Sequence, residues 1–158
     1  MKGMRIASGA ALTIGALAVT GVLLAPAALA VTPGSATLTA DCSGFGGGEA
    51  TLTATQDGTA ATMTLTSTEI TAPIGLGADS VASTLTLVKG GGGSTVFSGR
   101  ENPAMAAGDP VTVGPLSGTV ASGDSLEAYG GSLRMTVFGI TITCKATGPQ
   151  SPGPFVFD

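Results

Sequence analysis

The chain contains no histidine among its 158 residues, which removes the commonest acid–base chemistry of proteins. Without an imidazole, neither a Ser-His-Asp triad nor a Cys-His dyad can form, and zinc sites built on histidine are excluded. A Ser-Lys dyad needs a lysine in a Ser-x-x-Lys frame, and neither Lys89 nor Lys145 lies in one. The sequence therefore assigns no catalytic and no cofactor-binding residue.

Carboxylates are the remaining candidates for catalysis. Glycoside cleavage needs two carboxyl groups about 5–10 Å apart across a sugar-binding cleft. Glu101, Asp109, Asp124 and Glu127 lie in the loop-rich second half of the chain, where some of them could converge. The same residues also suit solvated loops, and aromatic platforms for sugars are scarce. A hydrolase that uses acidic residues on extracellular glycans therefore stays an alternative to a non-catalytic protein.

Metal binding has little support in the sequence. No Asp-x-Asp-x-Asp-Gly loop is present, which excludes an EF-hand, and no metal ligand is assigned. A surface calcium site built from Asp57, Asp79 or Asp124 with backbone carbonyls stays open. Asn102 is the sole asparagine, and Pro103 after it prevents its glycosylation.

Cys42 and Cys144 are the only cysteines, and they predict one intramolecular disulfide if the protein is exported. In the chain-entropy model, closing a loop of about 100 residues stabilises the fold by roughly 4–5 kcal/mol before strain is subtracted. Two buried free thiols or an intermolecular bond are the alternatives.

Alternating apolar and polar residues indicate β-strands over most of the chain. Residues 35–42 alternate Leu and Ala with Thr, as in a half-buried strand. Residues 50–55 and 62–68 alternate in the same way, and Asp57-Gly58 between them favours a tight hairpin. Threonine rows on exposed strand faces can bind ice, glycans or neighbouring sheets, but more often they simply favour β-structure.

Further strands are predicted at 81–89, 95–100, 111–113, 119–121 and 126–129, with a longest element over 133–145. In that last element a bulge at Gly139 would bring both halves to a common inward face. We expect seven to nine short strands in an antiparallel β-sandwich, immunoglobulin-like or jelly-roll-like. Both cysteines then face inward, so their bridge would clamp the two ends of the domain.

The N-terminus has the pattern of a secretory signal peptide. Lys2 and Arg5 precede an uncharged segment over 6–25, and the small residues Ala28 and Ala30 predict cleavage before Val31. Glycine and hydroxyl residues dilute the apolar stretch, and no basic cluster follows it, so we expect no stable membrane insertion after cleavage. The predicted division is a signal peptide (1–30), a secreted β-sandwich domain (31–146) and a Pro/Gly-rich tail (147–158).

Removing residues 1–30 leaves four basic residues against ten carboxylates, a net charge of −6. Such a chain repels phosphate backbones, so nucleic acid is not an expected partner. The tail ends in Phe155-Val156-Phe157, which can either add to a sheet edge, in its own domain or a partner's, or stay mobile.

The chain resembles small secreted actinobacterial β-sandwich proteins of unknown function. The resemblance rests on the signal peptide, on Thr39-Ala40-Asp41-Cys42, on the Asn-Pro-Ala…Gly-Asp-Pro-Val stretch (102–111) and on Ile-Thr-Ile-Thr-Cys-Lys-Ala (140–146). It implies a β-sandwich and supplies no catalytic residues.

The expected function is non-catalytic binding outside the cell or at its surface, to an unknown extracellular protein or glycan and without a cofactor. A self-associating surface protein is a further alternative, because Thr/Val/Ile-rich strands with exposed edges pair readily.

Overall fold

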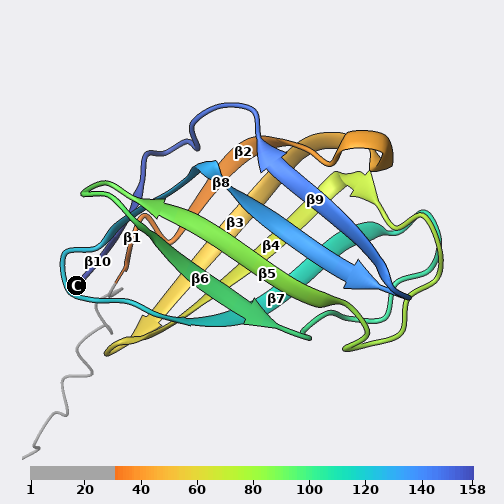
Figure 1. Cartoon of the computed structure of the whole chain (residues 1–158), viewed down its shortest axis with the longest axis horizontal. Coiled ribbons are helices and arrows are strands. Elements are labelled where there is room, and N and C mark those ends of the chain that lie inside the picture. Colours follow the sequence, from red (N-terminus) through yellow and green to blue (C-terminus); the bar gives the residue numbers. More distant parts are fainter. Residues whose placement is uncertain (1–30) are drawn as a thin grey trace, which may run out of the picture.

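The computed structural model describes residues 31–158. The predicted signal peptide, with Ala28 and Ala30 of its cleavage motif, lies outside the described residues. The described chain consists of ten strands and one 3-10 helix (Figure 1). In chain order these are β1 (Val31–Thr32), β2 (Ser35–Asp41), η1 (Ser43–Phe45), β3 (Gly47–Asp57), β4 (Ala60–Thr71), β5 (Ala82–Lys89), β6 (Ser94–Gly99), β7 (Pro110–Thr119), β8 (Ser125–Val137), β9 (Ile140–Ala146) and β10 (Phe155–Phe157).

Eight of these strands close into an antiparallel barrel. Hydrogen bonding gives the order β8-β5-β6-β7-β4-β3-β2-β9, and β9 pairs again with β8. The predicted all-β antiparallel fold is confirmed. A barrel takes the place of the expected immunoglobulin-like or jelly-roll-like sandwich, because β9 bonds to both β8 and β2 and leaves no free edge between two layers.

The interior is filled by the alternate residues that the sequence predicts to face inward. Leu52 of β3, Met63 of β4 and Leu87 of β5 are fully buried, and the intervening threonines lie on the outer surface. The β3–β4 hairpin forms as predicted, with Gly58 and Thr59 as its turn residues and Asp57 paired with Ala60. Opposite threonines pair across it, with the hydroxyl oxygens of Thr55 and Thr62 2.6 Å apart.

The C-terminal segment adds to the sheet at β8, outside the eight strands of the barrel. β10 pairs with the start of β8, and β1 pairs with β10 through Val31 and Phe157. Phe155 and Phe157 are fully buried, so the tail adds to its own sheet, which was one of the two alternatives. These strands lie at the end of the barrel marked C in Figure 1, far from the turn between β8 and β9.

The predicted bulge at Gly139 is wrong, because the chain turns there. Phe138 and Gly139 have φ of 50° and 76°, as in the two-residue turns that join antiparallel strands. β8 and β9 therefore form a hairpin in which Val137 pairs with Ile140. The change of parity between Val137 and Ile140 reflects this reversal.

Several predicted strands have other bounds in the structure: β7 joins the predicted strand at 111–113 to Thr119, and β8 joins the predicted strand at 126–129 to the first half of the predicted 133–145 element, whose second half is β9. β7 runs unbroken from Pro110 to Thr119 with irregular pairing to β4, and β8 runs through Gly130-Gly131. At Gly131 a Cβ atom would overlap the carbonyl oxygen of Thr86, so glycine permits β8 to approach β5 there. Within residues 31–158 no helix has the length and hydropathy needed to cross a membrane.

Candidate functional site

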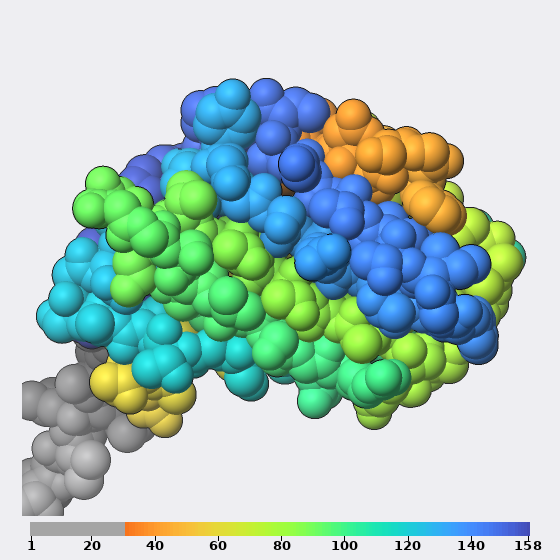
Figure 2. Space-filling model, viewed as in Figure 1, coloured from red at the N-terminus to blue at the C-terminus, as the bar shows by residue number. Residues whose placement is uncertain are grey.

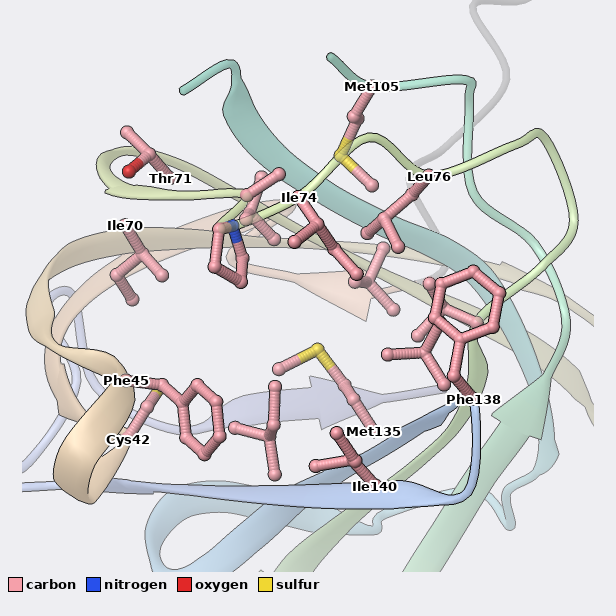
Figure 3. Close-up of a pocket in the computed structure, with 17 residues that line it drawn as sticks. Cys42, Phe45, Ile70, Thr71, Ile74, Leu76, Met105, Met135, Phe138 and Ile140 are labelled. Carbon is pink, nitrogen blue, oxygen red and sulfur yellow. The ribbon is translucent and has the colours of Figure 1, made fainter. Parts of the chain in front are cut away.

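One end of the barrel, which we call the mouth, opens into an apolar pocket of about 210 Å³. Three segments surround it beside the strand ends: η1, the loop over 72–81, and the loop over 102–109. Figure 3 shows labelled side chains from these segments and from β8 and β9 arranged around an open space. The lining residues are Cys42, Phe45, Ile70, Thr71, Ala72, Pro73, Ile74, Leu76, Val81, Met105, Val111, Val113, Met135, Val137, Phe138, Ile140 and Ile142.

The lining of the pocket carries no ionisable side chain. Thr71 contributes the one hydroxyl group, and Cys42 is held in a disulfide. A bound molecule would therefore meet aliphatic, aromatic and thioether groups. This composition favours apolar ligands, because a polar group buried here would lose its hydrogen bonds to water.

The rim of the pocket exposes large apolar side chains. The exposed fractions are 73% for Phe138, 55% for Ile140, 48% for Phe45 and 47% for Ile74. Within residues 31–158, four of the seven exposed large hydrophobic residues thus line this one pocket. Single exposed apolar residues are ordinary, but a contiguous set at a hollow marks a binding surface.

Asn102 holds the two loops of the mouth together. Its buried side chain accepts a hydrogen bond from the Val81 amide and donates to the carbonyl oxygens of Gly77 and Pro103, each at 2.9 Å. All three hydrogen bonds go to backbone groups of the two loops, which lie outside the strands. Asn102 therefore sets the shape of the mouth.

Backbone pairing between the two loops reinforces this arrangement. Leu76 and Met105 exchange two hydrogen bonds, of 2.7 and 2.9 Å, and both line the pocket. The Ala72 amide donates to the carbonyl oxygen of Asp109 at 2.9 Å. Loops fixed in this way keep the pocket open before a ligand arrives, which lowers the ordering cost of binding.

The predicted disulfide between Cys42 and Cys144 is confirmed. It joins the end of β2 to β9, and Cys42 forms part of the pocket wall. In Figure 2 the blue segment that contains β9 lies against the orange segment that contains β2 and η1. The bridge thus links barrel closure to the wall of the mouth.

The candidate catalytic carboxylates divide between the two ends of the barrel, with Glu101 and Asp109 in the segments around the mouth and Asp124 and Glu127 near the start of β8. Asp109 precedes β7 and Asp124 follows it, so the whole strand separates them. Each caps a turn, where Asp109 accepts from the Ala106 amide at 2.8 Å and Asp124 from the Ala121 amide at 2.9 Å. Glu127 accepts from the Gln150 amide at 2.9 Å.

The candidate calcium ligands are dispersed, with Asp57 at the end of β3, Asp79 in the loop over 72–81 and Asp124 before β8. Across residues 31–158 no three acidic or cysteine side chains are grouped to hold a metal ion. Lys89 forms an ion pair with Asp124 at 3.6 Å, and Lys145 is exposed.

Sequence reasoning missed the pocket and the role of Asn102. The pocket combines segments from six parts of the chain, and its members look like ordinary core or loop residues. One available signal was the single asparagine, Asn102, directly before Pro103 at the start of the second loop. Another was phenylalanine in a turn that favours asparagine or glycine.

The chain matches no protein-family model, no curated protein and no solved structure. The site is therefore interpreted from its own geometry.

Proposed function

We propose that this protein is a secreted, non-catalytic binding protein that holds a small apolar ligand, or the apolar part of a larger one, in the mouth of the barrel. The observation that carries the proposal is the open, wholly non-ionisable pocket with four exposed apolar side chains at its rim. Eight-stranded barrels are wide enough either to be filled by side chains or to hold one small ligand. Here the end near β10 is filled by Phe155 and Phe157, and the mouth is hollow.

The size of the pocket limits the ligand. An engineered apolar cavity of about 150 Å³ accommodates benzene. A pocket of about 210 Å³ therefore holds a slightly larger group, such as a bicyclic ring or a folded stretch of alkyl chain. Because the mouth is open, the rest of a longer molecule can extend outward over the rim.

Location outside the cell is part of the proposal. It is supported by the predicted signal peptide and by the disulfide, which persists in oxidising compartments. Expression of the full chain in a secreting bacterial host, followed by N-terminal sequencing of protein from the medium, tests it. A mature protein that begins at Val31 supports export, and protein retained in the cell with Met1 intact overturns it.

The binding proposal is tested by titration with the neutral apolar dye N-phenyl-1-naphthylamine, whose emission rises in apolar surroundings. Val137→Phe places a larger side chain in the half-buried lining. Val96→Phe is the matched control, because Val96 is 49% exposed and does not line the pocket.

We expect saturable binding of the dye to the unaltered protein and a loss of about tenfold or more in affinity in Val137→Phe, equivalent to 1.4 kcal/mol. Val96→Phe should bind as the unaltered protein does. Circular dichroism establishes that both variants keep the fold. Absence of saturable binding, or equal affinity of the two variants, overturns the proposal.

A further inference from the structure

We infer that the ligand is a cationic amphiphile, with an alkyl chain in the pocket and an alkylammonium head group, quaternary in its best-fitting form, at the rim. This inference rests on the proposed function and narrows it to a chemical class. Three features of the mouth carry it: the charges around the pocket, the lack of a basic group in its lining, and two exposed phenyl rings.

Four residues with carboxylate side chains lie in the segments around the mouth. Glu69 is adjacent to the lining residue Ile70 and its carboxylate accepts a hydrogen bond from the Glu49 amide, and Asp79 lies two residues before Val81, which also lines the pocket. The carbonyl oxygen of Asp109 accepts from the Ala72 amide.

A fourth carboxylate, Glu101, is placed by the hydrogen bond from the Gly114 amide to its carbonyl oxygen, next to Val113 of the lining. All four residues are exposed, and the segments that carry them lie at the mouth end of the barrel; the Asp109 carboxylate also accepts from the Ala106 amide.

Few positive charges offset these carboxylates. Arg100 is the one basic residue in the segments around the mouth, and Lys145 lies farther along β9, in register with Asp41. Among residues 31–158 the single ion pair, Lys89–Asp124, lies at the opposite end of the barrel. Because an apolar hollow is a poor dielectric, the field of the surrounding carboxylates is focused at its opening.

The same arrangement disfavours an anionic ligand. No lysine or arginine lines the pocket, so a fatty-acid carboxylate would find no charged partner. Its charge would also lie in the field of Glu69, Asp79, Glu101 and Asp109, and like charges brought together at an interface oppose binding. The head group that this mouth accepts is therefore positive.

Two exposed phenyl rings supply a second attraction for a cation. Phe45 on η1 and Phe138 at the β8–β9 turn project at the rim, and Figure 3 labels both beside the open space. Aromatic faces attract cations, and quaternary ammonium groups are bound in this way because their methyl groups also pack on the ring.

Phe138 has a backbone conformation that phenylalanine does not favour. Its φ of 50° lies in the left-handed region, where asparagine and glycine are enriched and bulky residues are rare. The turn geometry alone therefore does not account for a phenylalanine here. A role for the ring at the rim accounts for it, since unfavourable backbone conformations persist where function requires the residue.

The test compares three probes that share one alkyl chain: dodecyltrimethylammonium, 1-dodecanol and dodecanoate. Each probe is used to displace N-phenyl-1-naphthylamine from the protein spanning residues 31–158. Each is kept below its own critical micelle concentration, at low ionic strength. We expect the cation to bind best and dodecanoate worst, with about tenfold or more between them. The difference should narrow at an ionic strength of about 0.15 M, where charges are screened beyond roughly 8 Å.

Variants that remove carboxylates at one end of the barrel or the other test which end attracts the cation. Asp79→Asn with Glu101→Gln should weaken binding of the cation and leave 1-dodecanol unchanged. The matched control is Asp57→Asn with Asp158→Asn, which changes the net charge equally at the opposite end, where Gln56 hydrogen-bonds to the Asp158 backbone. The control should leave the preference for the cation intact.

Phe45→Leu tests the ring, because it keeps an apolar side chain and removes the aromatic face. It should weaken dodecyltrimethylammonium more than 1-dodecanol. If dodecanoate binds as well as the cation, or if both double charge variants behave alike, the inference is overturned while dye binding still supports the proposed function. If the dye itself does not bind, the proposed function fails and the inference fails with it.

Discussion

Cys42 and Cys144 lie opposite each other at the position that directly follows the ladder between β2 and β9, with their Cα atoms 3.9 Å apart. That ladder contains two residue pairs, Ala40 with Ala146 and Asp41 with Lys145, and it is the seam that closes the barrel. The ladders that join β2 to β3 and β9 to β8 are longer, so the disulfide reinforces the shortest ladder that β2 or β9 forms. Since Cys42 also lines the pocket, the same bond supports the wall of the mouth.

Replacing both cysteines by serine should destabilise the fold strongly. The bridge closes a loop of 102 residues, and in the chain-entropy model such a loop contributes about 4–5 kcal/mol to the free energy of unfolding. Guanidinium denaturation of the double variant and of the oxidised parent measures the difference. A loss below about 1 kcal/mol would show that the short β2–β9 ladder closes the barrel unaided.

Asn102→Ala should loosen the two loops of the mouth. It removes three hydrogen bonds and leaves the buried Val81 amide without this partner, at a cost of about 1–3 kcal/mol, while the Gly77 carbonyl keeps the hydrogen bond from Ser80. Hydrogen exchange should accelerate at the Leu76 and Met105 amides. Ser80→Ala is the control, because its exposed hydroxyl donates to the same Gly77 carbonyl and its loss should cost much less. Equal protection in both variants would contradict the role given to Asn102.

Phe138→Asn should raise stability and lower ligand affinity together. Asparagine tolerates the left-handed conformation at this turn position, so we expect a gain of about 1 kcal/mol in the free energy of unfolding. Removing the 73% exposed ring from the rim should weaken dye binding. Thermal denaturation and dye titration of the same preparation measure both effects. A variant that gains stability and binds as before would remove Phe138 from the site.

Gly131→Ala should disrupt the pairing of β5 with β8. The added Cβ would overlap the carbonyl oxygen of Thr86, so one strand must move, and we expect a loss of about 2 kcal/mol or more. Gly148→Ala is the matched control, because no atom lies within 4 Å of a Cβ placed there. Denaturant titrations of the two variants should differ clearly, and similar midpoints would show that the strands adjust without cost.

The sequence predicts the local features of this fold well. Alternation in β2, β3 and β4, the β3–β4 hairpin with Gly58 in its turn and the Cys42–Cys144 bridge are all found in the structure. The strands and the turn depend on residues that are neighbours in the sequence, and two cysteines allow only one intramolecular pairing. They follow from side-chain periodicity and from the positive φ that tight turns require.

Features that depend on long-range pairing were not predictable in this way. The choice between sandwich and barrel depends on whether β9 bonds to β2, more than 100 residues earlier in the chain. Gly139 illustrates the same difficulty on a small scale, since a bulge and a hairpin turn both explain the parity change around it. The pocket depends on the pairing of Leu76 with Met105, which neither loop reveals by itself.

The pairing of Val31 with Phe157 has a practical consequence for orientation. β1 and β10 lie side by side at the end remote from the mouth, so the two ends of the described chain leave the molecule together (Figure 1). A tether at either end, whether a fusion partner, a sensor chip or an attachment to an envelope, would be attached at the end opposite the mouth and would leave the opening accessible. Immobilised protein is therefore a faithful format for measuring capture of ligands from solution.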